Sequence, residues 1–239
     1  MDCPRCDKPM QPQALDGHMD REIEIDLCRP CQSVWFDARE NLQLTPGATL
    51  TMFRIIGENV ARPLLQERDL AKCPRCNAQL RRTQDMQRNT RFEYFRCPNN
   101  HGRLTTFFDF LREKDFIRPL TAHQIAELRK NVQFINCSNC GAPVDLAKHA
   151  DCQHCGSPLS MLDMQQAEKV IAQLREAEAA RTGKTIPPWL PLTLARARLE
   201  TESVFARLPG EHQWDNDYSS LGLVGAGLIE LMRLIKDES

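Results

Sequence analysis

The spacing of its eleven cysteines constrains this chain more than any other feature. Ten of them form five Cys-x-x-Cys pairs, and the eleventh, Cys97, stands four residues before His101. In chain order the pairs fall into three groups, each with two short pairs separated by 11 to 21 residues. Two residues between cysteines let one tight turn aim two thiolates at a single ion, and the separation leaves room for a hairpin. This arrangement is typical of a zinc ribbon.

Zinc takes four ligands, so the three groups predict three closed Zn²⁺ sites per chain only if His101 is counted. The predicted ligands are Cys3, Cys6, Cys28 and Cys31; Cys73, Cys76, Cys97 and His101; and Cys137, Cys140, Cys152 and Cys155. The alternatives are that Cys97 is a reactive thiol, that His101 is an ordinary surface histidine, or that single pairs are redox dithiols. A catalytic zinc would keep one position open for water, whereas each group here fills four positions.

The backbone after each turn supports the same interpretation. A Cys-x-x-Cys turn needs a following residue that tolerates a left-handed conformation, and Asp7, Asn77, Gly141 and Gly156 provide one. Gln32 fits less well. If the cysteines only filled a core, there would be no reason for this backbone signature to recur after them.

The segments between the cysteine pairs read as β-strands. "REIEIDLC" alternates apolar and acidic residues, "RFEYFRC" is rich in strand-favouring residues, and "LTTFFDF" after His101 predicts a third strand. We expect such modules to have almost no apolar core. The metal would then supply most of the folding free energy, roughly 10 to 16 kcal/mol per site in small zinc peptides.

The first module resembles the transcription-factor-IIB-type zinc-ribbon family of bacterial proteins. The matching residues are "CPRC" and "IDLCRPC", followed by Trp35, Asp37 and Glu40 in "VWFDAREN", with Arg39 where the family usually has glycine. The third module resembles a short bacterial zinc ribbon, and module two resembles a divergent copy of the first. The resemblance implies metal binding but does not choose among nucleic-acid binding, protein docking and bracing of an assembly.

Helices are expected between and after the ribbons. Phe53, Ile56, Val60 and Leu64 recur at helical spacing, and capping boxes are predicted at Thr121 with Gln124 and at Asp163 with Gln166. The expected fold is small α+β and metal-stabilised: three zinc ribbons, as short antiparallel β hairpins, joined by helices, with a mainly α-helical C-terminal third. The predicted boundaries are ribbons at 1–47, 72–112 and 136–162, linker helices at 48–71 and 113–135, and a helical region at 163–239.

The last predicted helix, 220–236, has apolar residues on most sides, so it must be buried somewhere. Its seam consists of Leu221, Val224, Leu228, Leu231 and Ile235. Three burial partners stay open: the protein's own helices, a partner protein or second copy, and the surface of a membrane. No apolar run is long enough for a spanning segment.

Charge is uneven although the net charge is only −1. Residues 1–47 hold five basic and nine acidic residues, whereas residues 72–112 hold nine and three. Arginines interleaved with aromatics suit single-stranded nucleic acid, and the candidates are Arg81, Arg82, Arg88, Arg91, Tyr94 and Arg96. The competing interpretation is that these aromatics form a small core while the arginines meet the acidic first ribbon.

The N-terminus lacks a secretory signal, so we expect a cytoplasmic protein with reduced thiols. No catalytic Ser-His-Asp set or phosphate-binding glycine loop is present. The expected function is a non-enzymatic zinc-binding adaptor or scaffold in a bacterial cytoplasm, which mediates protein–protein interactions through its ribbons and C-terminal helices. The alternative is a nucleic-acid-binding protein, for single-stranded RNA or DNA or associated with transcription, that uses the basic second ribbon.

Overall fold

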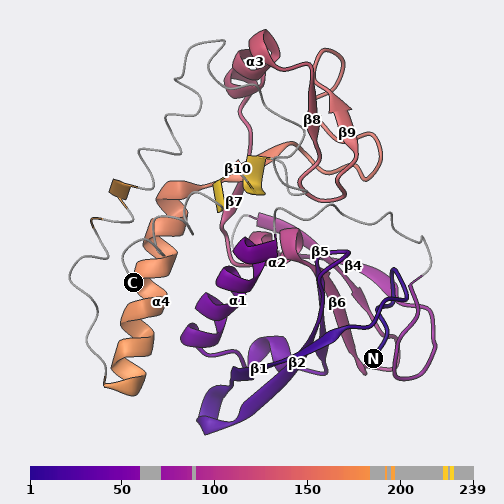
Figure 1. Cartoon of the computed structure of the whole chain (residues 1–239), viewed down its shortest axis with the longest axis vertical. Helices are drawn as coiled ribbons and strands as arrows, with labels where there is room; N and C mark the ends of the chain where they lie inside the picture. The colour runs from indigo at the N-terminus through magenta and orange to yellow at the C-terminus, as the bar shows by residue number, and fades with distance from the viewer. Residues whose placement is uncertain are drawn as a thin grey trace.

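The computed structural model describes residues 1–59, 71–87, 90–183, 192, 195–196, 223–225 and 227–228. Within these ranges the protein is a mixed α+β fold built on a six-stranded antiparallel sheet. Helices pack over the sheet, and two small two-stranded sheets lie apart from it (Figure 1).

The first cysteine group supplies three strands of the main sheet: β1 (Gln11–Asp16), β2 (Glu22–Cys28) and β3 (Ser33–Asp37). Short 3₁₀ helices η1 (His18–Asp20) and η2 (Glu40–Leu42) follow β1 and β3. In "REIEIDLC" the apolar residues Ile23, Ile25 and Leu27 are buried as predicted, but Asp26 is buried too, so the alternation holds only as far as Ile25.

The second group supplies β4 (Arg81–Gln87), β5 (Thr90–Arg96) and β6 (Gly102–Thr106). The predicted strand "LTTFFDF" is wrong in its second half, where helix α2 (Phe107–Glu113) begins. Thr106 causes this switch, since its hydroxyl accepts a hydrogen bond from the backbone N–H of Asp109 and so caps the helix.

The two groups join into one sheet with the strand order β1-β2-β3-β6-β5-β4. From one edge inward, the sheet contains the first, second and third strands of the first group, and from the other edge inward those of the second group. The junction is the antiparallel pairing of β3 with β6, in which Trp35 lies opposite Leu104 and Asp37 opposite Gly102. This internal symmetry agrees with the likeness between the two groups in sequence.

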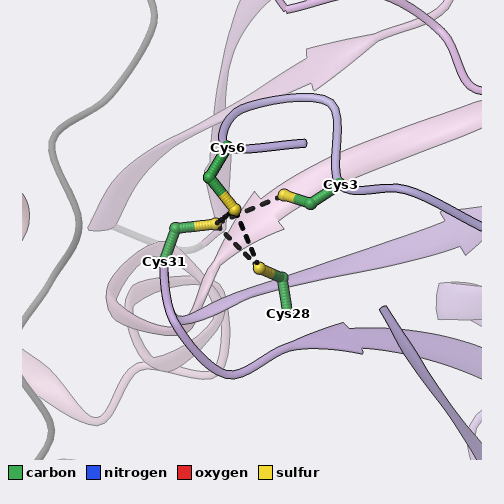
Figure 2. Close-up of side chains that lie close together, drawn as sticks. All are labelled: Cys3, Cys6, Cys28 and Cys31. Carbon is green, nitrogen blue, oxygen red and sulfur yellow. Dashed lines mark hydrogen bonds between the residues drawn. The ribbon is translucent and has the colours of Figure 1, made fainter. Parts of the chain in front are cut away.

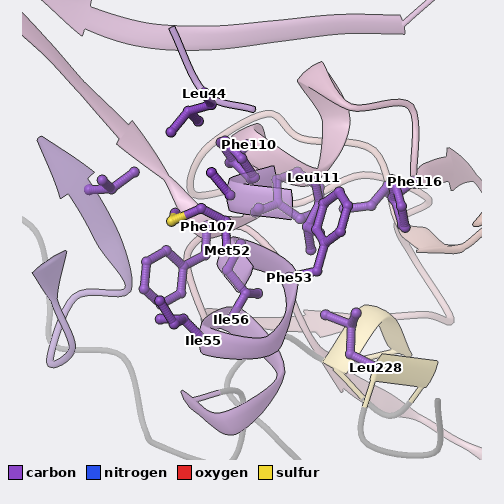
Figure 3. Packing of buried hydrophobic residues seen from close by; sticks show 14 of the residues in the cluster. Leu44, Met52, Phe53, Ile55, Ile56, Phe107, Phe110, Leu111, Phe116 and Leu228 are labelled. Atoms are coloured by element: carbon purple, nitrogen blue, oxygen red, sulfur yellow. The ribbon is translucent and has the colours of Figure 1, made fainter. Parts of the chain in front are cut away.

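The expectation of almost no apolar core is wrong. Side chains from the sheet pack against α1 (Pro46–Asn59), α2 and α4 (Met164–Thr182) in one large buried cluster (Figure 3). Phe53 of α1 lies between the rings of Phe110 and Phe116, with ring centroids 6.1 and 4.0 Å away. Helices that follow β3 and β6 therefore give the shared sheet a core that neither hairpin could form alone.

The third group has a smaller core of its own, and Ile117 and Leu162 of its flanking strands belong to the main core. Its strands β8 (Phe134–Asn136) and β9 (Pro143–Asp145) form a hairpin, and β7 (Ile117–Pro119) pairs with β10 (Ser160–Leu162). Helix α3 (Ala122–Asn131) starts with the predicted capping box of Thr121 and Gln124. Asp163 caps α4 by accepting from the N–H of Gln166, and Gly183 ends that helix with φ of 69°.

Several predictions concern residues outside the described ranges: Val60, Leu64, Arg88, most of the helix at 220–236, and with it Leu221, Leu231 and Ile235. The described part of the chain does not show a helical C-terminal third. Val224 and Leu228 are fully buried in the chain's own main core, and Leu228 lies near α1 in Figure 3. None of the described helices is both long and apolar enough to cross a membrane.

Candidate metal centres

The cysteine turns have the backbone geometry that the sequence predicts. After the second cysteine of each turn, the backbone adopts a positive φ at Asp7, Asn77, Gly141 and Gly156. At each of these residues the N–H donates to the carbonyl of the first cysteine at 2.8 to 3.0 Å. Gln32, the weaker candidate, also adopts a positive φ of 49°. Each turn therefore orients two thiols toward the same point.

The first centre brings Cys3, Cys6, Cys28 and Cys31 together (Figure 2). The sulfur of Cys3 lies 3.3 Å from that of Cys31, and the sulfur of Cys6 lies 3.4 Å from that of Cys28. Four sulfurs bound to zinc at about 2.3 Å would lie roughly 3.8 Å apart, so the cluster fits one tetrahedral ion. Only Cys6 is partly exposed.

The second centre resolves the question of Cys97. Its sulfur lies 3.6 Å from that of Cys76 and 3.6 Å from Nδ1 of His101, which is itself 3.9 Å from the sulfur of Cys73. The four ligand atoms form one cluster, and His101 contributes the exposed corner. Cys97, in contrast, is fully buried.

The third centre contains Cys137, Cys140, Cys152 and Cys155, whose sulfurs are paired at 3.6 and 3.7 Å. It packs within the smaller core of α3 and the β8–β9 hairpin. In all three centres the ligand atoms lie within 4.8 Å of one another, and all eleven cysteines are free of disulfides. The clusters therefore fit three metal ions with protein ligands in every position, and thiolate-rich tetrahedral sites of this kind suit zinc.

A buried arginine lies within the first cysteine turn of the first centre. Arg5, between Cys3 and Cys6, is 4% exposed, and burial lowers the pKa of its guanidinium while the neighbouring cysteines oppose that shift. A cation here would offset the negative charge of a zinc ion bound to four thiolates. Arg5 also lies over the ring of Phe95 in the second group, 5.9 Å from its centroid.

The Trp35, Asp37 and Glu40 motif forms a small hydrogen-bonded cluster at the end of β3. The indole N–H of Trp35 donates to Asp37 Oδ1 at 2.8 Å, and the backbone N–H of Asp37 donates to Glu40 Oε2 at 2.7 Å. Burial raises the pKa of Glu40 to about 7, although the hydrogen bond from the Asp37 backbone N–H opposes this shift. Burial also raises the pKa of Asp26. The motif holds β3 and the chain that follows it; it does not supply a metal ligand.

One contact of this cluster agrees with the expectation that arginines of the second group meet the acidic first group. Arg75, inside the first turn of the second group, forms an ion pair with Asp37, with Nη2 2.6 Å from Oδ2. The signal for this contact was present, because "CPRC" occurs in both groups and places an arginine at the same position of each turn. Arg5 and Arg75 each reach the other group.

Three of the predicted nucleic-acid residues have partners within the chain. Arg82 pairs with Glu93 on the neighbouring strand, Tyr94 packs under the guanidinium of Arg103, and Arg96 donates to Asn100. Arg81 and Arg91 are exposed, and within the described ranges neither forms an ion pair. The acidic first group thus neutralises Arg75, which was not among the candidates.

Comparisons with protein-family models, with curated proteins and with solved structures found no match to this chain. The three ligand clusters therefore carry the interpretation of the site by themselves.

Proposed function

We propose that this chain is a non-enzymatic zinc-binding adaptor or scaffold of the bacterial cytoplasm. Its zinc ribbons, the first of the transcription-factor-IIB type, would present protein-docking surfaces. The observation that carries the proposal is the distribution of exposed apolar side chains. Each cysteine group has at least one exposed apolar side chain in it or beside it, at or near the end of a strand or hairpin.

These side chains are large and project into solvent. Met19 and Leu42 of the first group are 86% and 72% exposed, Met86 of the second is 60% exposed, and Phe134 beside the third is 57% exposed. Single exposed apolar residues are ordinary, but protein interfaces favour methionine and aromatic anchors. Their repetition on three metal-braced units supports docking.

The ligand sets support a structural role for the metals. A catalytic zinc keeps a coordination position for water or substrate, whereas each cluster here offers four protein ligands. Closed sites of this kind stabilise a fold and do not activate water. The hairpins would then be rigid and could serve as docking surfaces for a partner protein.

The test is a pull-down with surface variants of the full chain. Removing the segment that holds Val224 and Leu228 would take two buried residues out of the core, so substitutions at exposed positions are preferable. Met19→Glu, Met86→Glu and Phe134→Glu should each lose co-purifying protein, whereas the matched control Gln87→Glu, at the exposed end of β4, should keep it. Identical partner profiles for all four variants would contradict the adaptor.

A second candidate, binding of single-stranded RNA or DNA, is favoured by one arrangement. Arg81 on edge strand β4 lies directly opposite Arg96 on β5, and like charges facing each other across a sheet destabilise it. A phosphate would relieve that repulsion. Arg81→Glu should abolish a salt-sensitive shift with single-stranded oligonucleotides, while Arg82→Gln, which loses only an internal pair with Glu93, should retain most of it. No shift at low salt with the unmodified chain would remove this candidate.

A further inference from the structure

We propose that the first and second metal centres form one coupled unit, so that filling either centre raises the metal affinity of the other, while the third centre binds independently. The proposal rests on metal occupancy of the clusters and not on the adaptor function. Its basis is the set of contacts that join the two centres.

The two centres share one small hydrophobic cluster. Trp35 of β3 and Leu104 of β6 are cross-strand neighbours and are both fully buried in it. The same cluster contains cysteines from each centre, namely Cys3, Cys28, Cys31, Cys73 and Cys97. Displacing either set of cysteines would therefore disturb packing around the other set.

The junction of β3 and β6 begins at a ligand. Gly102 directly follows His101, and its carbonyl accepts a hydrogen bond from the N–H of Cys97 at 3.0 Å. A Cβ at Gly102 would lie 2.3 Å from the carbonyl oxygen of Phe36 and 2.7 Å from the Trp35 ring. The backbone of the second centre is thus pressed against the strand that carries the Trp35 motif.

Two arginines add reciprocal links. Arg5, within the first centre's turn, lies over Phe95 of β5, and Arg75, within the second centre's turn, pairs with Asp37 of β3. A turn that loses its metal would lose its fixed geometry and with it the position of its arginine. Each arginine therefore transmits the state of its own centre to the other group.

The third centre shares neither that hydrophobic cluster nor that strand junction, although the Cys140 thiol acts electrostatically on Arg5. Its cysteines belong to another hydrophobic cluster, with Leu120, Ile125 and Leu128. Among the described strands, those of the third group do not pair with the six-stranded sheet. Its occupancy should therefore be independent of the other two.

The experiment measures zinc per chain against buffered free zinc in the full protein. Coupling between sites is typically about 5- to 150-fold and must be equal in both directions. Cys76→Ser should raise the free zinc needed to half-fill the first centre by a factor in that range, and Cys6→Ser should do the same, by the same factor, to the second. Cys152→Ser, which removes a ligand of the third centre, should leave both unchanged.

A variant that keeps all twelve ligands separates a loss of coupling from simple misfolding. In native mass spectra during chelation, the unmodified chain should lose two ions together, and Arg75→Gln should increase the population in which only one of that pair is lost. Arg82→Gln, whose ion pair stays within the second hairpin, is the matched control. The proposal is overturned if Cys76→Ser leaves the first centre's midpoint within twofold, if Arg75→Gln matches Arg82→Gln, or if the unmodified chain does not hold zinc.

Discussion

At the residue scale, His101 makes the ligand count complete. Cys97 is the one cysteine without a Cys-x-x-Cys partner, and the structure places His101 Nδ1 3.6 Å from its sulfur. The pairing was predictable because tetrahedral zinc requires four ligands and only three cysteines were available. The roles of Arg5 and Arg75 were not predictable, because a sequence does not reveal which group each turn faces.

His101→Ala should lower the zinc content of the purified protein from three to about two ions per chain and destabilise the second hairpin. His101 is exposed, so the substitution removes a ligand without opening a core cavity. Metal analysis measures the content. His123→Ala, at another exposed histidine, is the control and should keep three ions. Three ions in His101→Ala, with ready alkylation of Cys97 in the native protein, would refute the assignment.

The raised pKa of Glu40 predicts that the stability of the protein depends on pH. Its pKa of about 7 lies above the ordinary value of 4.5, so the folded protein binds a proton that the unfolded chain releases between those values. Stability from this group therefore increases as pH falls from above 7 toward 4.5. Glu40→Gln should raise the melting temperature relative to the unmodified chain at pH 8, and the gain should shrink by pH 6. The exposed control Glu22→Gln should give no such trend, and a pH-independent gain for Glu40→Gln would contradict burial as the cause.

At the element scale, spacing and capping signals predicted local structure well. The strands β2 and β5 and the starts of α3 and α4 follow alternation and Thr or Asp caps that a sequence displays directly. The start of α2 was not predicted, because "TTFFDF" has strong strand propensity and the cap at Thr106 decides against it. The joining of β3 to β6 depends on long-range packing that no local pattern encodes.

Neighbouring threonines test the cap of α2. Thr106→Val removes the acceptor for the Asp109 N–H and should lower the free energy of unfolding by about 1 kcal/mol. Thr105 is the matched control, since its buried hydroxyl has no hydrogen-bond partner among the described residues. Thr105→Val should be neutral or stabilising. Denaturant unfolding measures both, and equal losses would show that the cap is not the cause.

At the scale of the whole molecule, the first two cysteine groups and three helices form one body with a substantial apolar core. The metals would then fix the ends of the sheet and hold the hairpins, while the core supplies much of the folding free energy. Chelation should therefore expose the cysteine turns first and leave part of the helical structure formed. Circular dichroism during chelation checks this, and complete loss of helix with the first ion would contradict it.

The central claim is that twelve side chains form three closed metal sites. Native mass spectrometry of the full chain, purified without added metal or chelator, tests it most directly. The account predicts three zinc ions per chain and eleven cysteines that resist alkylation until the ions are removed. A chain carrying two or fewer zinc ions, with Cys97 alkylated in the native state, would contradict it.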